Sequence, residues 1–419
     1  MFIAPMSNQE LIPHLFRNEF TKIVSVLTRS LGLAQIGLAE DIAGDTFLAA
    51  TETWPYKGIP ANPTAWLYAV ARNKAKNYLR RHQLFENKIS PFLKSELNHE
   101  VESGMEWSDQ NILDSQLQMI FVICHPSISI ESQLGLALRI LCGMGIEEIA
   151  NALLTNKETI NKRLYRAKET LREEEISLEL PSLPEINHRL ATVLKVIYLL
   201  FNEGYYSESD DVVLKKELCQ DAMRLCHLLL GYERTNTPAV NALLALMYFH
   251  ASRFPARLDD TGEMILYHDQ DESLWDQQLI AQGVQFLHKA SQGNTLSTYH
   301  LEASIAYWHT IKTDTPEKWE NILNLYNHLL SIEYSPVAAL NRTYALSKVK
   351  GNEQALMETQ KLDLKDNHYY YILMGELIKS KDPAKAQEYY KKAWDLAKSK
   401  SDKRTILKRL NALPDRDLR

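Results

Sequence analysis

Apolar residues recur at three- and four-residue steps along most of this chain, which is the spacing of one face of an α-helix. Glycine and proline, which interrupt helices, are scarce, with 15 of each in 419 residues. The pattern therefore predicts an all-α fold. The chain is too long for one ordinary hydrophobic core, so we expect it to divide into several domains.

Interruptions in the helical pattern predict the domain boundaries. A first helical block occupies residues 1–83, and the polar, acid-rich stretch 84–111 reads as a linker. A second helical block covers residues 112–176. Two nearby prolines in SLELPSLPEINHR mark the next boundary. A larger helical domain is expected over residues 185–419.

The first residues, the apolar runs and the cysteine spacing favour a cytoplasmic protein without a membrane segment. The start MFIAPMSNQE has none of the three parts of a signal peptide, and the apolar run ATVLKVIYLLF is too short to span a bilayer. Four scattered cysteines do not form the framework of a disulfide-rich domain.

One segment concentrates positive charge although the whole chain has a formal net charge of -6. The stretch PTAWLYAVARNKAKNYLRRH, residues 63–82, contains five Lys or Arg and no acid. Asn62 and Pro63 fit the start of a helix, and its buried stripe is expected to be Leu67, Val70, Ala71, Ala75 and Tyr78. An ordinary surface helix mixes charges of both signs, whereas charge of one sign favours a polyanionic partner.

Aromatic residues beside such cations suit single-stranded nucleic acid, because bases stack on rings while cations hold the backbone. The candidate nucleic-acid contacts in this segment are Trp66, Arg72, Asn73, Lys76, Asn77, Arg80 and Arg81. A solvated charged face with no partner is the alternative.

A second basic segment, GIEEIANALLTNKETINKRLYRAKETLR, has the pattern of a helix-turn-helix. Two apolar faces flank a break at LTN, and Thr155 with Glu158 fits a capping box at the second helix. The start of that helix would enter the major groove. The candidate DNA contacts are Lys157, Thr159, Lys162 and Arg163. Arg166 and Lys168 lie further along the helix, and we expect them to contact phosphates. A helical hairpin that binds no DNA remains an alternative.

The C-terminal part shows weak internal repetition. In DPAKAQEYYKKAWDLA, Ala386, Tyr390 and Ala393 have the small–aromatic–small spacing of a tetratricopeptide repeat. The segment SPVAALNRTYALSKVKGNEQALMETQ predicts a helix pair, with Gly351 in the turn and Ala355 on the second helix. A generic all-helical domain is the alternative.

The usual catalytic motifs are not found in the sequence, so we expect no enzyme, cofactor or metal site. The neighbours Cys124 and His125 suggest a core thiol and a polar capping residue. Cys219 and Cys226 have core spacing. The acidic stretch DDTGEMILYHDQDESLWD, with His268, is expected to be a hydrogen-bonded loop, and a divalent-ion or enzyme site there is the alternative.

These motifs together resemble the bacterial RNA polymerase sigma factors of the extracytoplasmic-function class. AEDIAGDTFLAATETW and NPTAWLYAVARNKAKNYLRRH resemble sigma region two, and GIEEIANALLTNKETINKRLYRAKETLR resembles region four. The segments FVICHPSISIESQLGLALRILCGM, VIYLLFNEGYYSES, ALMYFHASRFPARLDDTGEMILYHDQDESLWD and SPVAALNR are similar to a subgroup with a long C-terminal, tetratricopeptide-like domain.

The resemblance implies a transcription initiation factor that is not itself an enzyme. Asp41, Asp45 and Phe47 would face the clamp helices of the RNA polymerase core, and region four would meet its flap and the minus-thirty-five element of promoter DNA. The first basic helix would hold the minus-ten strand. The C-terminal domain would regulate, or bind a protein or peptide. An interaction scaffold with a purely structural helix-turn-helix is the alternative.

Overall fold

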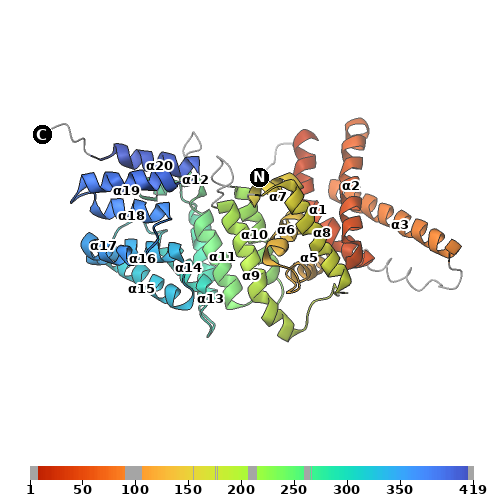
Figure 1. The fold of residues 1–419 in the computed structure, drawn as a ribbon. Coiled ribbons are helices and arrows are strands. Elements are labelled where there is room, and N and C mark those ends of the chain that lie inside the picture. Colours follow the sequence, from red (N-terminus) through yellow and green to blue (C-terminus); the bar gives the residue numbers. More distant parts are fainter. Residues whose placement is uncertain are drawn as a thin grey trace. The chain divides into compact units, whose positions relative to one another are not determined.

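The computed structural model describes residues 8–89, 106–153, 155–174, 176, 178–205, 215–258, 265 and 267–413. These residues form helices joined by turns and loops, with no β-strand among them (Figure 1). The all-α prediction is confirmed. No helix within these ranges is long and apolar enough to cross a membrane.

The chain divides into two compact units. The first comprises Met1–Leu200 with Gly231–Thr235, and the second comprises Phe201–Leu230 with Asn236–Arg419. The helices of the first unit are α1 (Asn8–Leu31), η1 (Leu33–Gln35), α2 (Ile36–Lys57), α3 (Pro63–Ile89), α5 (Asp109–Ile123), α6 (Ile130–Leu136), η2 (Ala137–Leu141), α7 (Ile146–Ala152), α8 (Lys157–Glu173) and most of α9 (Leu183–Tyr205).

Helix α1 is central to the first unit because it packs against α2, α3 and α5. Its inner side is apolar, and Ile23, Val24 and Leu27 are completely buried. Two buried hydroxyl groups on the same helix, Ser25 and Thr28, donate to backbone carbonyls four residues earlier. Such local hydrogen bonds let polar side chains enter a core without an unsatisfied donor.

Helix α3 begins as its sequence predicts. The backbone N–H of Ala65 donates to Oδ1 of Asn62 at 2.9 Å, so Asn62 caps the helix and Pro63 follows as its first residue. Leu67, Ala71 and Ala75 are completely buried. The other two residues of the expected stripe, Val70 and Tyr78, are half-buried.

A short π-helical turn, η2, follows α6 without a break. Its geometry is set by a hydrogen bond of 3.1 Å from the N–H of Cys142 to the carbonyl of Ala137, five residues earlier. The loop after it contains Gly143 with a φ of +70°, which glycine adopts without strain.

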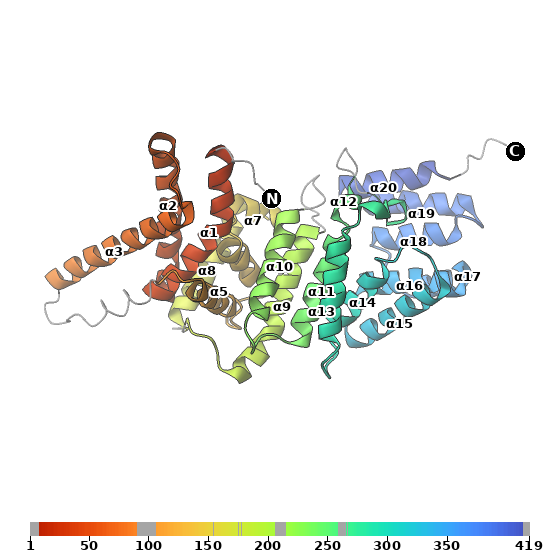
Figure 2. The ribbon, with the colours of Figure 1, turned by 180° about the vertical axis from the view of Figure 1, so that it is seen from behind.

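The second unit is a succession of helices, each packed against the next in chain order from α14 to α20 (Figure 2). Its elements are the end of α9, α10 (Lys216–Leu230), α11 (Pro238–Ala251), α12 (Phe254–Arg257), η3 (Tyr267–Asp269), η4 (Glu272–Leu274), α13 (Gln277–Ala290), α14 (Thr298–Trp308), α15 (Pro316–Ile332), α16 (Pro336–Lys350), α17 (Asn352–Gln360), α18 (His368–Ile378), α19 (Pro383–Leu396) and α20 (Lys400–Asn411).

The predicted helix pair over residues 335–360 is confirmed as α16 and α17. Gly351 joins them with a φ of +86°, and Ala355 is completely buried. On α19 the expected face of Ala386, Tyr390 and Ala393 is buried. A Cβ atom at Gly375 on α18 would lie 2.5 Å from the Tyr390 ring, so glycine permits the close approach of these two helices.

Candidate nucleic-acid interface

The predicted cations of α3 lie on the side of the helix that faces solvent. Six candidate residues are exposed and are called here the basic face of α3: Arg72, Asn73, Lys76, Asn77, Arg80 and Arg81. The nearby Lys74 is half-buried, and its Nζ lies 3.5 Å from a carboxylate oxygen of Asp45. The basic face therefore presents several cations and two amides together, as a nucleic-acid backbone requires.

Trp66 lies differently from the rest of the set. Its ring is half-buried and makes an edge-to-face contact with Trp54 of α2, with ring centroids 5.4 Å apart. This contact fixes the indole beside the first turn of α3 and leaves part of it open to solvent. A base stacked on Trp66 would therefore meet a ring that is already held in place.

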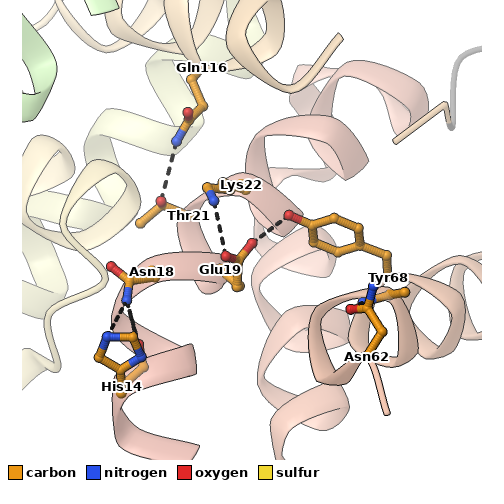
Figure 3. Close-up of polar contacts among 9 residues, drawn as sticks. His14, Asn18, Glu19, Thr21, Lys22, Asn62, Tyr68 and Gln116 are labelled. Carbon is orange, nitrogen blue, oxygen red and sulfur yellow. Dashed lines mark hydrogen bonds and ion pairs between the residues drawn. The ribbon is translucent and has the colours of Figure 1, made fainter. Parts of the chain in front are cut away.

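The orientation of α3 is fixed by a buried carboxylate on α1. Glu19 is 7% exposed, accepts a hydrogen bond from the Tyr68 hydroxyl, and pairs with Nζ of Lys22 at 3.0 Å (Figure 3). The Tyr68 ring also stacks on Trp107, with centroids 4.5 Å apart. Burial, followed by the hydrogen bond and charge of Glu19, raises the pKa of Tyr68, so its hydroxyl remains a donor.

The second basic segment forms two helices, α7 and α8, but its capping differs from the prediction. The N-cap of α8 is Asn156, whose Oδ1 accepts from the N–H of Thr159 at 2.7 Å. Thr155 lies one residue before this N-cap, because α8 begins at Lys157. The proposed Thr155–Glu158 capping box is therefore wrong.

Helix α8 buries one side and exposes the other. Ile160, Leu164, Ala167 and Leu171 are buried, and α8 packs against α6, α7 and η1. Lys157, Lys162 and Arg166 are exposed, while Thr159 and Arg163 are partly exposed. Asn161 and Tyr165 are exposed beside them, and Tyr165 is 66% exposed. Lys168 is an exception, because its ammonium group bonds to the buried Glu40 of α2.

An acidic strip runs along the exposed side of α2. Asp41, Asp45, Leu48 and Glu52 are exposed and follow one another at four-, three- and four-residue steps, so they share one helical face. Leu48 is 55% exposed. Sequence reasoning missed Leu48, although its spacing from the two aspartates was the available signal.

Phe47 was expected on the same surface, but the structure places it in the core. The side chain is 4% exposed and makes an edge-to-face contact with Phe16 of α1, with ring centroids 5.0 Å apart. The physical reason is the helical period, because residue 47 points about 160° away from residue 45 on α2, near residue 43, which is also buried. Phe47 therefore packs in the core on the side of α2 opposite the acidic strip.

A depression of about 510 Å³ adjoins the acidic strip. It combines an aromatic side with several carboxylates and one guanidinium group, and its lining residues are Phe16, Phe20, Glu40, Asp41, Gly44, Asp45 and Arg139. Such a lining suits a cationic or amphipathic side chain of a partner.

The other candidate sites have structural explanations. Burial raises the pKa of the Cys124 and Cys219 thiols to about 12, and the four cysteines are free and buried. In the acidic stretch, Asp271 accepts from the N–H of Ser273 and Asp276 caps α13. The side chain of His268 lies outside the described residues. Within those residues, no group of three or more His, Cys, Asp or Glu could hold a metal ion.

The first unit contains a domain of the Sigma-70 region 2 type. The family model for Sigma-70 region 2 matches residues 15–85, which cover all of α2 and most of α1 and α3. A family of unknown function (DUF6596) matches residues 189–291.

The chain belongs to the same family as an uncharacterized protein of Rhizobium meliloti (strain 1021). The two are 34% identical over 385 residues, which are 90% of each chain. The chain is also similar to the ECF RNA polymerase sigma-E factor of Haemophilus influenzae (strain ATCC 51907 / DSM 11121 / KW20 / Rd), with 25% identity over 154 residues, 36% of this chain and 79% of that protein. No solved structure matches the chain.

Proposed function

We propose that this protein is a sigma factor of the extracytoplasmic-function class, which directs the RNA polymerase core to specific promoters and helps to open them. The observation that carries the proposal is the basic face of α3. It is exposed, it holds cations with no acid between them, and it lies within the residues that match Sigma-70 region 2.

The two basic helices have different tasks in this proposal. The basic face of α3, with Trp66 at its start, holds unpaired bases of the minus-ten element. Helix α8 reads duplex DNA through Lys157, Thr159, Lys162 and Arg163 near its N-terminal end, and Arg166 contacts phosphate. The exposure of these side chains and the buried opposite side of α8 support this division.

Opening the promoter requires the polymerase. Separating roughly ten base steps costs about 14 kcal/mol, at about 1.4 kcal/mol per step. Stacking returns about 1–3 kcal/mol per captured base. The few bases that Trp66 and α3 can hold do not cover this cost, so the isolated protein binds promoter DNA weakly and does not open it.

The acidic strip of α2 is the proposed contact with the clamp helices of the core enzyme. Asp41 and Asp45 supply charge, Leu48 supplies an apolar contact, and Phe47 holds the helix from inside. An exposed leucine between carboxylates is complementary to a partner surface that carries cations beside an apolar side chain. The region-four helices would contact the polymerase flap.

The C-terminal helices act in this proposal as a tetratricopeptide-like domain that binds a protein or peptide and regulates the sigma domains. The buried small–aromatic–small face of α19 and the close α18–α19 approach at Gly375 support this assignment. The functional division is residues 1–83 for region two, 84–111 for the linker, 112–176 for region four and 185–419 for the C-terminal domain.

The test combines copurification with transcription. The full-length protein should retain core polymerase and direct run-off transcription from a defined promoter pair. A variant with Arg72→Gln, Lys76→Gln and Arg80→Gln should still bind the core but fail to initiate. If the wild-type protein neither binds core nor supports transcription, the interaction-scaffold alternative is favoured. A permanganate-reactive bubble formed without polymerase would contradict the proposed division of labour.

The contribution of the C-terminal domain is tested with a shortened chain. A chain ending at Tyr205 keeps all of α9, whose residues Ile186, Leu190 and Val193 are buried. A cut near Pro184 would remove this part of the first unit. A regulatory domain predicts that transcription changes between the full chain and the shortened chain, whereas equal transcription would contradict regulation.

A further inference from the structure

One buried carboxylate of α2 holds two cations that come from the helix-turn-helix half of the first unit. Glu40 is 6% exposed. Its Oε1 lies 2.7 Å from Nε of Arg139 on η2, and its Oε2 bonds to the ammonium group of Lys168 on α8. We call these three residues the Glu40 latch. A carboxylate this deeply buried is costly to leave unpaired, so α2 depends on cations supplied by η2 and α8.

Two other hydrogen bonds, both between α1 and α5, differ in kind from the contacts of Glu40. Gln116 on α5 meets Thr21 on α1 at 3.4 Å (Figure 3), and Arg29 donates to Asn111 at 2.6 Å. Each of these ties pairs at most one charge with a neutral group. The Glu40 latch instead neutralises charge, and one of its cations belongs to the helix proposed to bind DNA.

Lys168 continues the exposed stripe of α8. It follows Asn161 and Tyr165 at steps of seven and three residues, which keeps all three on neighbouring parts of the helix surface. Tyr165 is 66% exposed, whereas the Lys168 side chain is 25% exposed because it turns toward Glu40. Glu40 therefore pairs with the ammonium group of Lys168, which a DNA phosphate could otherwise contact.

The latch also adjoins the proposed polymerase surface. Glu40 and Arg139 line the same depression as Asp41 and Asp45. Adjacent residues of α2 thus face two ways, with Glu40 toward η2 and α8 and Asp41 toward solvent. A basic partner side chain that enters the depression meets Glu40 as well as the acidic strip.

We propose that the Glu40 latch holds the first unit in a closed state that must open for the protein to engage promoter and polymerase together. On opening, DNA phosphate replaces Glu40 as the partner of Lys168, and a basic group of the core enzyme replaces Lys168 at Glu40. This inference rests on the proposed sigma function for its purpose. The closed state itself is a property of the free protein and is measurable without polymerase.

The experiment is energy transfer between dyes on the full-length protein. Thr51→Cys on α2 and Glu158→Cys on α8 are exposed positions, and the four native cysteines are buried, so the two new thiols can be labelled selectively. Glu40→Gln should lower the transfer efficiency of the free protein. It should also steepen the salt dependence of duplex binding by about 0.9 in log K per log [salt], the effect of one additional phosphate contact.

The matched control is Lys157→Gln on the same helix. Lys157 pairs with Glu147 at 3.0 Å, and both side chains are exposed. The control should make the salt dependence shallower by about 0.9 and leave energy transfer unchanged. If Glu40→Gln fails to fold, Lys168→Gln decides, because Arg139 still neutralises Glu40. That variant should lower the energy transfer without steepening the salt dependence.

The outcomes separate the latch from the proposed function. Folded Glu40→Gln and Lys168→Gln proteins with wild-type energy transfer would overturn the latch, whatever the polymerase assays show. Lower transfer in these variants supports the latch even if no core polymerase copurifies, in which case the sigma assignment alone fails. Addition of core polymerase to the wild-type protein should lower transfer as Glu40→Gln does, and unchanged transfer in a core-bound complex would overturn opening.

Discussion

Tyr68 on α3 donates a hydrogen bond from its hydroxyl group to the carboxylate of Glu19 on α1, and Glu19 is 7% exposed. The helix that carries the basic face is therefore joined to the central helix of the first unit by a charge-assisted hydrogen bond. Because the Tyr68 ring also stacks on Trp107, a single residue fixes α3 against two other parts of the chain.

Replacing Tyr68 with Phe should weaken the attachment of α3. The change leaves Glu19 with one partner fewer in a buried position, which costs about 1–3 kcal/mol. Hydrogen exchange of the α3 backbone should accelerate by about fivefold to 150-fold. Tyr56→Phe is the control, because Tyr56 is 90% exposed and should leave exchange unchanged. Equal exchange in the two variants would show that the hydrogen bond does not hold α3.

Arg163→Ala should weaken recognition of the upstream promoter element by the polymerase-bound protein. A side chain that reads a base pair contributes about 1–3 kcal/mol, or roughly fivefold to 150-fold in affinity. Arg172→Ala is the control at the far end of α8, where Arg172 pairs with Glu169 on the surface. Gel-shift titration with matched and mutated upstream elements measures the effect. A loss that is the same for both elements would assign Arg163 to phosphate instead.

Trp66→Ala should spare the closed complex and impair opening. The indole is held by Trp54 and offers a fixed ring for stacking, worth about 1–3 kcal/mol for each captured base. Gel shifts report closed-complex binding and permanganate reactivity reports opening. Trp66→Phe keeps an aromatic ring and should restore part of the opening. Equal loss in both assays would contradict separate roles for α3 and α8.

Leu48→Lys should reduce association with the core polymerase at least tenfold, because it places a cation in the middle of the acidic strip and removes an apolar contact, a combined effect on the order of 1.4 kcal/mol or more. Leu274→Lys is the matched control. Leu274 is 48% exposed on η4, close to the 55% of Leu48, and belongs to the second unit, outside the strip and outside the region-four helices. Surface plasmon resonance with immobilised core measures both. Similar losses for the two variants would count against the strip.

Gly375→Ala should destabilise the pairing of α18 and α19. The added Cβ would lie 2.5 Å from the Tyr390 ring, and forcing such a group into a packed contact costs typically about 1–3 kcal/mol. Gly37→Ala on α2 has open space around its Cβ and should be neutral or stabilising. Hydrogen exchange of α18 measures the difference. Protection equal to that of the wild type would show that α18 and α19 accommodate the added methyl group without loss of stability.

The individual helices can be predicted from the sequence better than the contacts between them. The Asn62 cap, the buried stripe of α3 and the turn at Gly351 follow from local rules of spacing and backbone conformation, and all are present. The predicted Thr155 cap is wrong because two adjacent residues have side chains that could cap α8, and the helix begins one residue later than a Thr155 cap requires.

The candidate site shows the same division. Exposure of the basic face follows from its charge pattern, since the apolar stripe must turn inward. The prediction for Phe47 rests on a motif resemblance and is wrong, because the helical period places residue 47 on the buried side of α2. The Glu40 latch could not be predicted from the sequence. Arg139 and Lys168 lie 99 and 128 positions from Glu40, and no local pattern pairs residues so far apart.

The π-helical turn η2 has a consequence for how Arg139 is aimed. A turn closed by a bond over five residues holds one residue more than an α-helical turn of the same height. Deleting Ala137 would restore ordinary spacing and rotate the following side chains by about 100° about the axis. Arg139 would then swing away from α2 although its chemistry is unaltered. In this segment the number of residues, and not only their identity, determines whether an arginine meets its carboxylate.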